Sequence, residues 1–207
     1  MNLPNKLTVS RFALTAVFLW AVFSRSAVND TMALVVFCLA GVTDFLDGRI
    51  ARRRGLITNF GVLMDPLADK VLTCSAFIAL VERHVLTPPP LNWLGPLPVF
   101  PKVEAWMAVV IVARELAITG LRLLAASKNV VLAAERYGKH KTISQIVAII
   151  ALLLMDAYGE WWPWLQSLLK PWVPVFAQLA LWLTVLLTAT SGALYLWRNR
   201  EIYLKDA

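Results

Sequence analysis

Apolar residues along this chain fall into six long runs that are separated by short polar connections. The runs cover roughly residues 7–24, 31–50, 62–82, 104–125, 142–158 and 173–197. Each is close to the length of about 17–25 residues that a helix needs to cross a bilayer. The pattern predicts an all-α integral membrane protein, in which residues 1–207 form one domain of six transmembrane helices.

The first run has an alternative interpretation as a signal peptide, because Lys6 and Arg11 accompany an apolar stretch that ends in small residues. We favour a retained helix, for a reason that the motifs below supply. Basic residues gather in the second and fourth connections and in the C-terminal tail. Cytoplasmic loops carry such an excess of lysine and arginine. We therefore expect a cell-membrane protein with both termini in the cytoplasm.

Composition supports the membrane assignment and narrows the function. Hydrophobic residues make up 59% of the chain and charged residues 16%, whereas soluble domains carry about 25% charged residues. The net charge of +7 is explained by cytoplasmic loops beside anionic lipid, so no nucleic acid partner is expected. Cys38 and Cys74 both lie in apolar runs, which argues against a disulfide framework.

Four aspartates interrupt the second and third runs. Asp44 and Asp47 are three residues apart and share one face of a helix. Asp65 and Asp69, four residues apart, share a face of the next helix. Because the connection between these helices is short, we expect antiparallel neighbours whose acidic faces oppose each other around a polar cavity open to the cytoplasm.

A carboxylate in the centre of a membrane helix costs about 2.5–3.5 kcal/mol, so four of them need a reason. Pairing with Arg49, Arg52 and Lys70 would account for one or two. Carboxylate clusters bind hard divalent cations, and two such ions can clamp a pyrophosphoryl group. A divalent-cation transporter would also use buried carboxylates, and it remains the alternative from another functional class.

Small residues lie on the same two helix faces. Gly48 and Ala51 follow Asp44 by four and seven residues, and Gly61 precedes Asp65 by four. Their size would let a ligand approach the backbone beside the carboxylates. A transporter would not need small residues and an arginine at these fixed offsets.

Taken together, the pattern Asp44-x2-Asp47-Gly48-x2-Ala51-Arg52-x8-Gly61-x3-Asp65-x3-Asp69 resembles the signature of the CDP-alcohol phosphotransferases at every defined position. The opening segment LPNKLTVSRF also looks like the family's start, which is why we keep the first helix. The pieces ARE at 113–115 and YGKHKTISQ at 137–145 resemble the phosphatidylglycerophosphate synthase branch. The last 60 residues add nothing specific.

The resemblance implies a reaction and a set of roles. Family members transfer the phosphatidyl group of a CDP-linked lipid to an alcohol and release CMP, and they form homodimers. The matching residues imply that Asp44, Asp47, Asp65 and Asp69 ligate two Mg²⁺ or Mn²⁺ ions, with Asp69 also the catalytic base. Binding of the CDP-lipid falls to Gly48, Arg52 and Thr58, together with the small residues Ala51 and Gly61. By analogy alone, Asn5, Thr8 and Arg11 are further candidates for the nucleotide side.

Three cations point to the acceptor. Arg114 lies in the fourth run, where an arginine is costly and usually functional, and Lys139 and Lys141 open the fifth helix. Positive-inside topology would also explain the lysines. Glu115 is adjacent to Arg114, but neighbours in a helix point apart, so the alternative is a polar pair that bridges different helices. With the resemblance, the cations favour an acceptor phosphate, hence glycerol 3-phosphate as substrate with CDP-diacylglycerol. Inositol phosphate is the nearest competitor.

Overall fold

The computed structural model describes residues 3–24, 27–54, 59–86, 102–128 and 137–204. Six long helices run through these segments: α1 (Leu3–Phe23), α2 (Ala27–Arg54), α3 (Asn59–Leu86), α4 (Ala105–Ser127), α5 (Tyr137–Ala157) and α7 (Val173–Arg198). Shorter pieces are a 3-10 turn at Tyr158–Glu160, α6 (Pro163–Leu169) and α8 (Arg200–Leu204). No strand occurs in the described segments, so the all-α prediction is confirmed for them.

Each predicted apolar run coincides with one long helix to within a few residues at its ends. The agreement has a simple cause. A helix satisfies its own backbone hydrogen bonds, and therefore it is the favoured conformation for a continuous apolar segment that must leave water. Helix α6 begins with Pro163 at its first position, where the missing amide hydrogen costs nothing.

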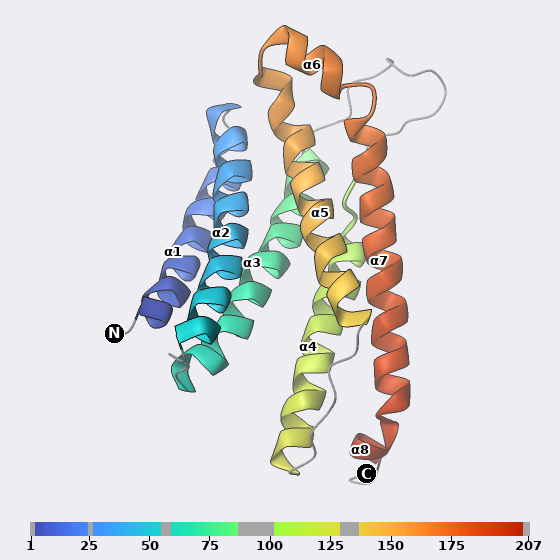
Figure 1. The fold of residues 1–207 in the computed structure, drawn as a ribbon. Helices are drawn as coiled ribbons and strands as arrows, with labels where there is room; N and C mark the ends of the chain where they lie inside the picture. The colour runs from blue at the N-terminus through green and yellow to red at the C-terminus, as the bar shows by residue number, and fades with distance from the viewer. Residues whose placement is uncertain (1–2, 25–26, 55–58, 87–101, 129–136, 205–207) are drawn as a thin grey trace.

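The helices form two groups that share a core. Helix α1 packs mainly on α2 and α3, while α7 packs on α5 and α4 (Figure 1). Helix α5 joins the groups because it also packs on α2 and α3. Residues from all six long helices meet in one apolar cluster, including Phe18, Phe37, Phe77, Ile111, Leu152 and Leu181. Helix α6 lies across one end of the bundle, opposite the end where α8 finishes.

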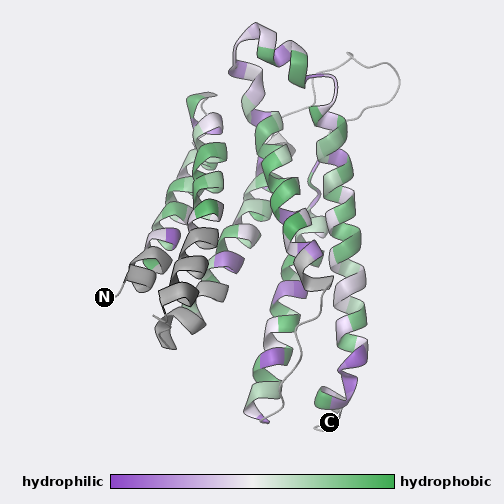
Figure 2. Ribbon diagram, viewed as in Figure 1, coloured by the Kyte–Doolittle hydropathy of each residue, from purple (hydrophilic) through white to green (hydrophobic). Residues whose placement is uncertain are grey.

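The outer surface of the bundle is unusually apolar. Leu116, Leu183 and Leu186 are each more than half exposed, and apolar residues predominate along the described parts of the long helices in Figure 2. Large exposed apolar patches mark surfaces that contact lipid or another protein. Within the described residues, the segments His140–Glu160 and Val173–Arg198 are long and apolar enough to cross a membrane. These two spans support a membrane protein, whereas six spans remain a prediction.

A cluster of ion pairs lies between the helices at the end of the bundle near α6. The guanidinium of Arg83 in α3 pairs with Asp30 of α2 and, at 3.0 Å, with Asp156 of α5. It also donates to the Val22 carbonyl of α1 at 3.2 Å. One side chain thus ties four helices together. Nearby, the indole of Trp161 donates to Thr31 Oγ1 at 2.9 Å, which fixes the segment that leads into α6.

Candidate active site

The four aspartates of the sequence pattern lie on two helices of opposite direction. Asp44 and Asp47 belong to α2, and Asp65 and Asp69 belong to α3. The two helices run antiparallel in Figure 1, as predicted. The carboxylates of the first three aspartates are outside the described part of the structure, so the site is built here from Asp69.

Asp69 faces a cavity of about 350 Å³ between the N-terminal helices and α5. Arg11 of α1, Gly41 of α2 and Thr73 of α3 line it with Asp69, and the remaining lining is largely apolar. Arg11 is 1% exposed. Gly41 precedes Asp44 by three residues in α2, which is less than one helical turn. The cavity therefore extends from Asp69 to within a turn of Asp44.

A second polar group is buried between α4 and α5. The carboxylate of Glu115 is 7% exposed, and its Oε1 atom pairs with Lys141 of α5 and, at 3.2 Å, with Nη1 of Arg114. The expectation that Arg114 and Glu115 point apart is wrong for their charged ends, because the long arginine side chain brings Nη1 to 3.2 Å from Glu115 Oε1. The bridge between helices is made by Glu115 and Lys141.

Lys70 is a further cation in this region that the sequence did not single out as an acceptor residue. Its ammonium donates to Thr119 Oγ1 of α4, and Thr119 Oγ1 donates in turn to the Glu115 carbonyl at 2.7 Å. Its position next to Asp69 suggested a partner for carboxylates instead. The sequence does contain an indication of this role. Successive residues of a helix point in different directions, so Lys70 cannot share the face of Asp69 and can reach a neighbouring helix instead.

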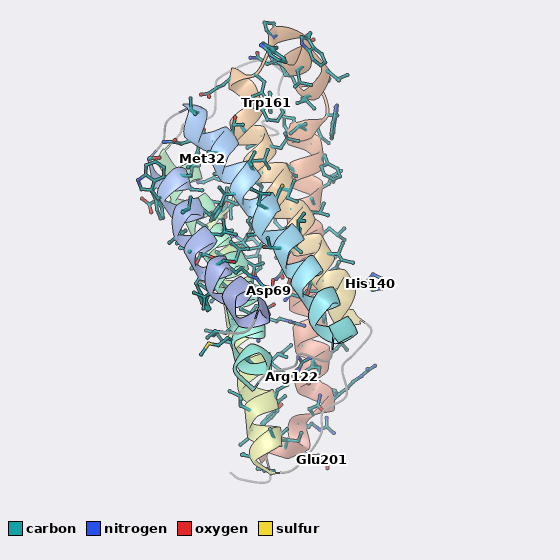
Figure 3. The ribbon with its side chains drawn as sticks, turned by 60° about the vertical axis from the view of Figure 1, so that its left-hand side comes forward. Met32, Asp69, Arg122, His140, Trp161 and Glu201 are labelled. Carbon is teal, nitrogen blue, oxygen red and sulfur yellow. The ribbon has the colours of Figure 1, made fainter. Side chains whose placement is uncertain are left out.

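The two polar groups lie close together. The Lys141 ammonium interacts electrostatically with Asp69, Lys70 and Arg114. Figure 3 shows Asp69 and His140, the neighbour of Lys141, at the same level of the bundle. Trp161 marks one end and Glu201 the other. The carboxylate expected to act as base therefore lies within electrostatic range of Lys141, which is buried, in a group whose other cations, Arg114 and Lys70, are partly buried.

Several predicted residues are placed only by their helices. Gly48, Ala51 and Arg52 lie in α2, Gly61 in α3 and Lys139 in α5, and their side chains are outside the described residues. Thr58 lies entirely outside them. Among the side chains that are described, no group of three or more carboxylates, histidines or cysteines could hold a metal ion. Asp44, Asp47 and Asp65 are not among these described side chains.

Comparison with known proteins agrees with the resemblance seen in the motif. A relative from Bacillus subtilis (strain 168), named CDP-diacylglycerol–glycerol-3-phosphate 3-phosphatidyltransferase, is 39% identical over 97% of this chain and 96% of its own length. The protein of that name from Escherichia coli (strain K12) is 34% identical over 73% and 76%. A probable phosphatidylglycerophosphate synthase from Mycobacterium tuberculosis (strain H37Rv) is 38% identical over 72% and 64%.

The sequence profile of one family covers most of the chain. The profile described as CDP-alcohol phosphatidyltransferase matches residues 1–190, a range that holds all four aspartates, Arg114 and Lys141. The match extends through most of α7, beyond the point at which the motifs of the sequence end. The chain belongs to the CDP-alcohol phosphatidyltransferase family.

Proposed function

We propose that this protein transfers the phosphatidyl group of CDP-diacylglycerol to glycerol 3-phosphate, releasing CMP and forming phosphatidylglycerol phosphate. The acceptor hydroxyl oxygen forms a bond to the phosphatidyl phosphorus. The bond from that phosphorus to CMP breaks, and its electron pair leaves with CMP. The observation that carries the proposal is the buried pair of Lys141 and Glu115, with Arg114 paired to the same carboxylate and Asp69 within electrostatic range of Lys141. The names of the relatives from B. subtilis and E. coli support the same pair of substrates.

Asp69 is the residue that we assign to the proton of the acceptor hydroxyl. Its carboxylate lines the cavity and interacts electrostatically with Lys141, so the base and the cations can reach the two ends of one small acceptor. A general base must lie within hydrogen-bond reach of the proton that it removes. In our proposal glycerol 3-phosphate places its hydroxyl at Asp69 while its phosphate meets the cations.

The family implies two Mg²⁺ or Mn²⁺ ions, and the residues fit them. Asp44, Asp47, Asp65 and Asp69 supply the carboxylate oxygens that these hard cations prefer. The Asp69 cavity runs to within a turn of Asp44, so α2 and α3 can offer donors to one site. Bound divalent ions would neutralise the pyrophosphate and stabilise charge on the leaving CMP.

The same cavity suits the lipid nucleotide. Its walls include Phe37, Leu72, Ile146 and Ile150, and its polar groups are concentrated at Arg11, Asp69 and Thr73. Ligand sites commonly combine an apolar lining with a few placed polar groups. In our proposal the apolar part holds the glycerol end of CDP-diacylglycerol. Arg52 and Arg11 contact its phosphates, and Gly48, Ala51, Thr58 and Gly61 complete the nucleotide side.

The charge of the cation group favours an acceptor phosphate. Arg114, Lys141 and Lys70 outnumber the carboxylates of Glu115 and Asp69 by one, and the remaining positive charge would attract a phosphate monoester, which carries about −1.5 to −2 at neutral pH. Lys139, two residues before Lys141, adds a further cation in the same helix. Serine or choline brings no phosphate and would leave this buried charge unmatched.

We extend the proposal to the setting of the enzyme. Six transmembrane helices would carry the site near the cytoplasmic face of the cell membrane, where glycerol 3-phosphate is available, and the chain would act as a homodimer. The apolar outer surface and the polar interior at Arg11, Glu115 and Lys141 support this arrangement. Charges inside a membrane domain normally face the protein interior, as these do.

The acceptor site is tested with Lys141→Ala and with Lys102→Ala, an exposed lysine before α4, as the matched control. Losing one hydrogen bond to a charged group weakens binding by about 1.5–3 kcal/mol, which is about ten- to a hundredfold. The Lys141 variant should raise the KM for glycerol 3-phosphate by this factor and leave the KM for CDP-diacylglycerol unchanged. An equal rise in both KM values would contradict the assignment.

A further inference from the structure

Helix α7 makes a close contact with α4 at Gly192. A Cβ atom added to Gly192 would lie 2.7 Å from Cγ and 3.6 Å from Cβ of Arg114. A contact of 2.7 Å between two carbon atoms is far inside their optimal separation of about 3.5–4.0 Å. The Cγ atom is bonded to Cβ, so it can move away only if Arg114 changes its χ1 rotamer or the two helices move apart. Arg114 keeps its present rotamer because residue 192 has no side chain.

The rotamer decides where the guanidinium of Arg114 lies. The first part of the side chain lies against α7 at Gly192, and Nη1 ends 3.2 Å from Glu115 Oε1. Ala189 and Ala193 lie beside Gly192 in a groove of about 310 Å³ that Arg114 also lines. The side chain of Arg114 thus occupies a space on α7 that small residues leave for it.

Helix α7 also contacts the part of α5 that carries Lys141. Thr184 Oγ1, two turns before Gly192, donates to the Ser144 carbonyl of α5 at 2.8 Å, and both partners lie at least partly buried. Ser144 Oγ donates to the Lys141 carbonyl at 2.8 Å. One helix therefore holds the segment of α5 that carries Lys141 and also supports Arg114 in α4.

We propose that Gly192 is a positioning residue, which holds the guanidinium of Arg114 in place for the acceptor phosphate. The inference rests on the acceptor site proposed above. It gives α7, which carries none of the family motif, a part in the choice of acceptor. Gly192 touches no substrate in this account and acts only through Arg114.

The direct test compares Gly192→Ala with Gly120→Ala in purified full-length enzyme. Gly120 is an exposed glycine in the middle of α4, and a Cβ atom there would meet nothing within 4 Å. We expect Gly192→Ala to raise the KM for glycerol 3-phosphate about tenfold, a loss of about 1.4 kcal/mol in binding, with no change in the KM for CDP-diacylglycerol. Gly120→Ala should leave both values unchanged. Wild-type acceptor KM in Gly192→Ala would overturn the inference.

A double-mutant cycle separates this inference from the proposed function. If Gly192 acts through Arg114, the double variant Arg114→Ala/Gly192→Ala should have the same acceptor KM as Arg114→Ala alone. Multiplying effects would show that Gly192 acts elsewhere and would overturn the inference while leaving the acceptor site intact. An Arg114→Ala variant with wild-type acceptor KM would instead overturn the acceptor site itself, and with it this role of Gly192.

Protein stability supplies a second readout. The clash involves Cγ of Arg114, which alanine at position 114 lacks. If Gly192→Ala folds poorly, the double variant should therefore recover the melting temperature of Arg114→Ala. Failure of the double variant to recover it would overturn the contact as the cause. Recovery would support the contact even where the single variant gives too little enzyme for kinetics.

Discussion

Replacing Glu115 by glutamine should destabilise the protein and should make its stability depend on the acceptor. Glutamine keeps the size and one oxygen of the side chain but removes the charge that Arg114 and Lys141 share. The side chains of Glu115 and Lys141 are 9% and 5% exposed, so water cannot replace the lost partner. Two buried cations would then face each other without a carboxylate between them.

The size of the effect follows from this burial. Removing one partner of a buried ion pair typically costs about 3–5 kcal/mol. For a chain of this length each kcal/mol lowers the melting temperature by about 2–4 °C. Glu115→Gln should therefore melt about 6–20 °C below the wild type in the same detergent. The conversion from kcal/mol to degrees is the one that holds for soluble domains of this length. Glu104→Gln is the control, because Glu104 is exposed and a glutamine oxygen can still accept from Trp106 Nε1.

Glycerol 3-phosphate should recover much of this loss. A ligand at 100 times its Kd stabilises the folded state by about 2.7 kcal/mol. Its phosphate would meet two cations that no longer have Glu115 as a partner, so the variant should gain more than the wild type at equal ligand concentration. The measurement is a thermal melt with and without glycerol 3-phosphate, with glycerol as the uncharged comparison. A variant that melts like the wild type, or that responds equally to glycerol, would refute the reasoning.

Further predictions concern other parts of the molecule. Arg83→Met should lower the free energy of unfolding by about 3–5 kcal/mol, because it leaves the carboxylates of Asp30 and Asp156 without Arg83. The specific activity of the folded fraction should persist, since Arg83 lies about 21 Å along α3 from Asp69. Asp69→Asn should lose kcat more than CDP-diacylglycerol binding, whereas Asp44→Asn should be partly rescued by added Mn²⁺; equal loss of binding in both would reduce Asp69 to a ligand. Chelation of divalent ions should abolish turnover reversibly. In a chain without native cysteines, Arg53→Cys and Trp164→Cys should be labelled from opposite sides of the membrane, and labelling from one side would refute the topology.

The helices could be predicted from the sequence, including the two that carry the four aspartates. Apolar runs of membrane-spanning length leave few alternatives to helices, and spacings of three and four residues place Asp44 with Asp47 and Asp65 with Asp69 in successive helices. These are local properties of the chain. The resemblance then identified the family, which the match over residues 1–190 confirms. The resemblance also suggested Asn5, Thr8 and Arg11 for the nucleotide side; the structure places Arg11 in the Asp69 cavity, and the side chains of Asn5 and Thr8 lie outside the described residues.

Contacts between helices distant in the sequence could not be predicted. Spacing along α4 gave no indication that Glu115 lies between Arg114 and Lys141, because that arrangement depends on how α4 and α5 pack and on a flexible arginine side chain. The sequence places Lys70 next to Asp69 and so favours a carboxylate as its partner. Its partner in the structure, Thr119, is 49 residues away in the sequence and could not be predicted. Gly192 was one small residue in an apolar helix, and only the approach of α7 to α4 shows what its missing side chain accommodates.

The central claim is tested most directly by the choice of acceptor. Purified protein is given CDP-diacylglycerol and Mg²⁺ together with glycerol 3-phosphate, inositol 1-phosphate or serine in separate reactions, and CMP release is measured. The account predicts rapid CMP release with glycerol 3-phosphate and phosphatidylglycerol phosphate as the lipid product. A clear preference for inositol 1-phosphate would keep the reaction but contradict the acceptor. Release of CMP with serine alone, or with none of the three, would contradict the site that Asp69, Arg114 and Lys141 are proposed to form.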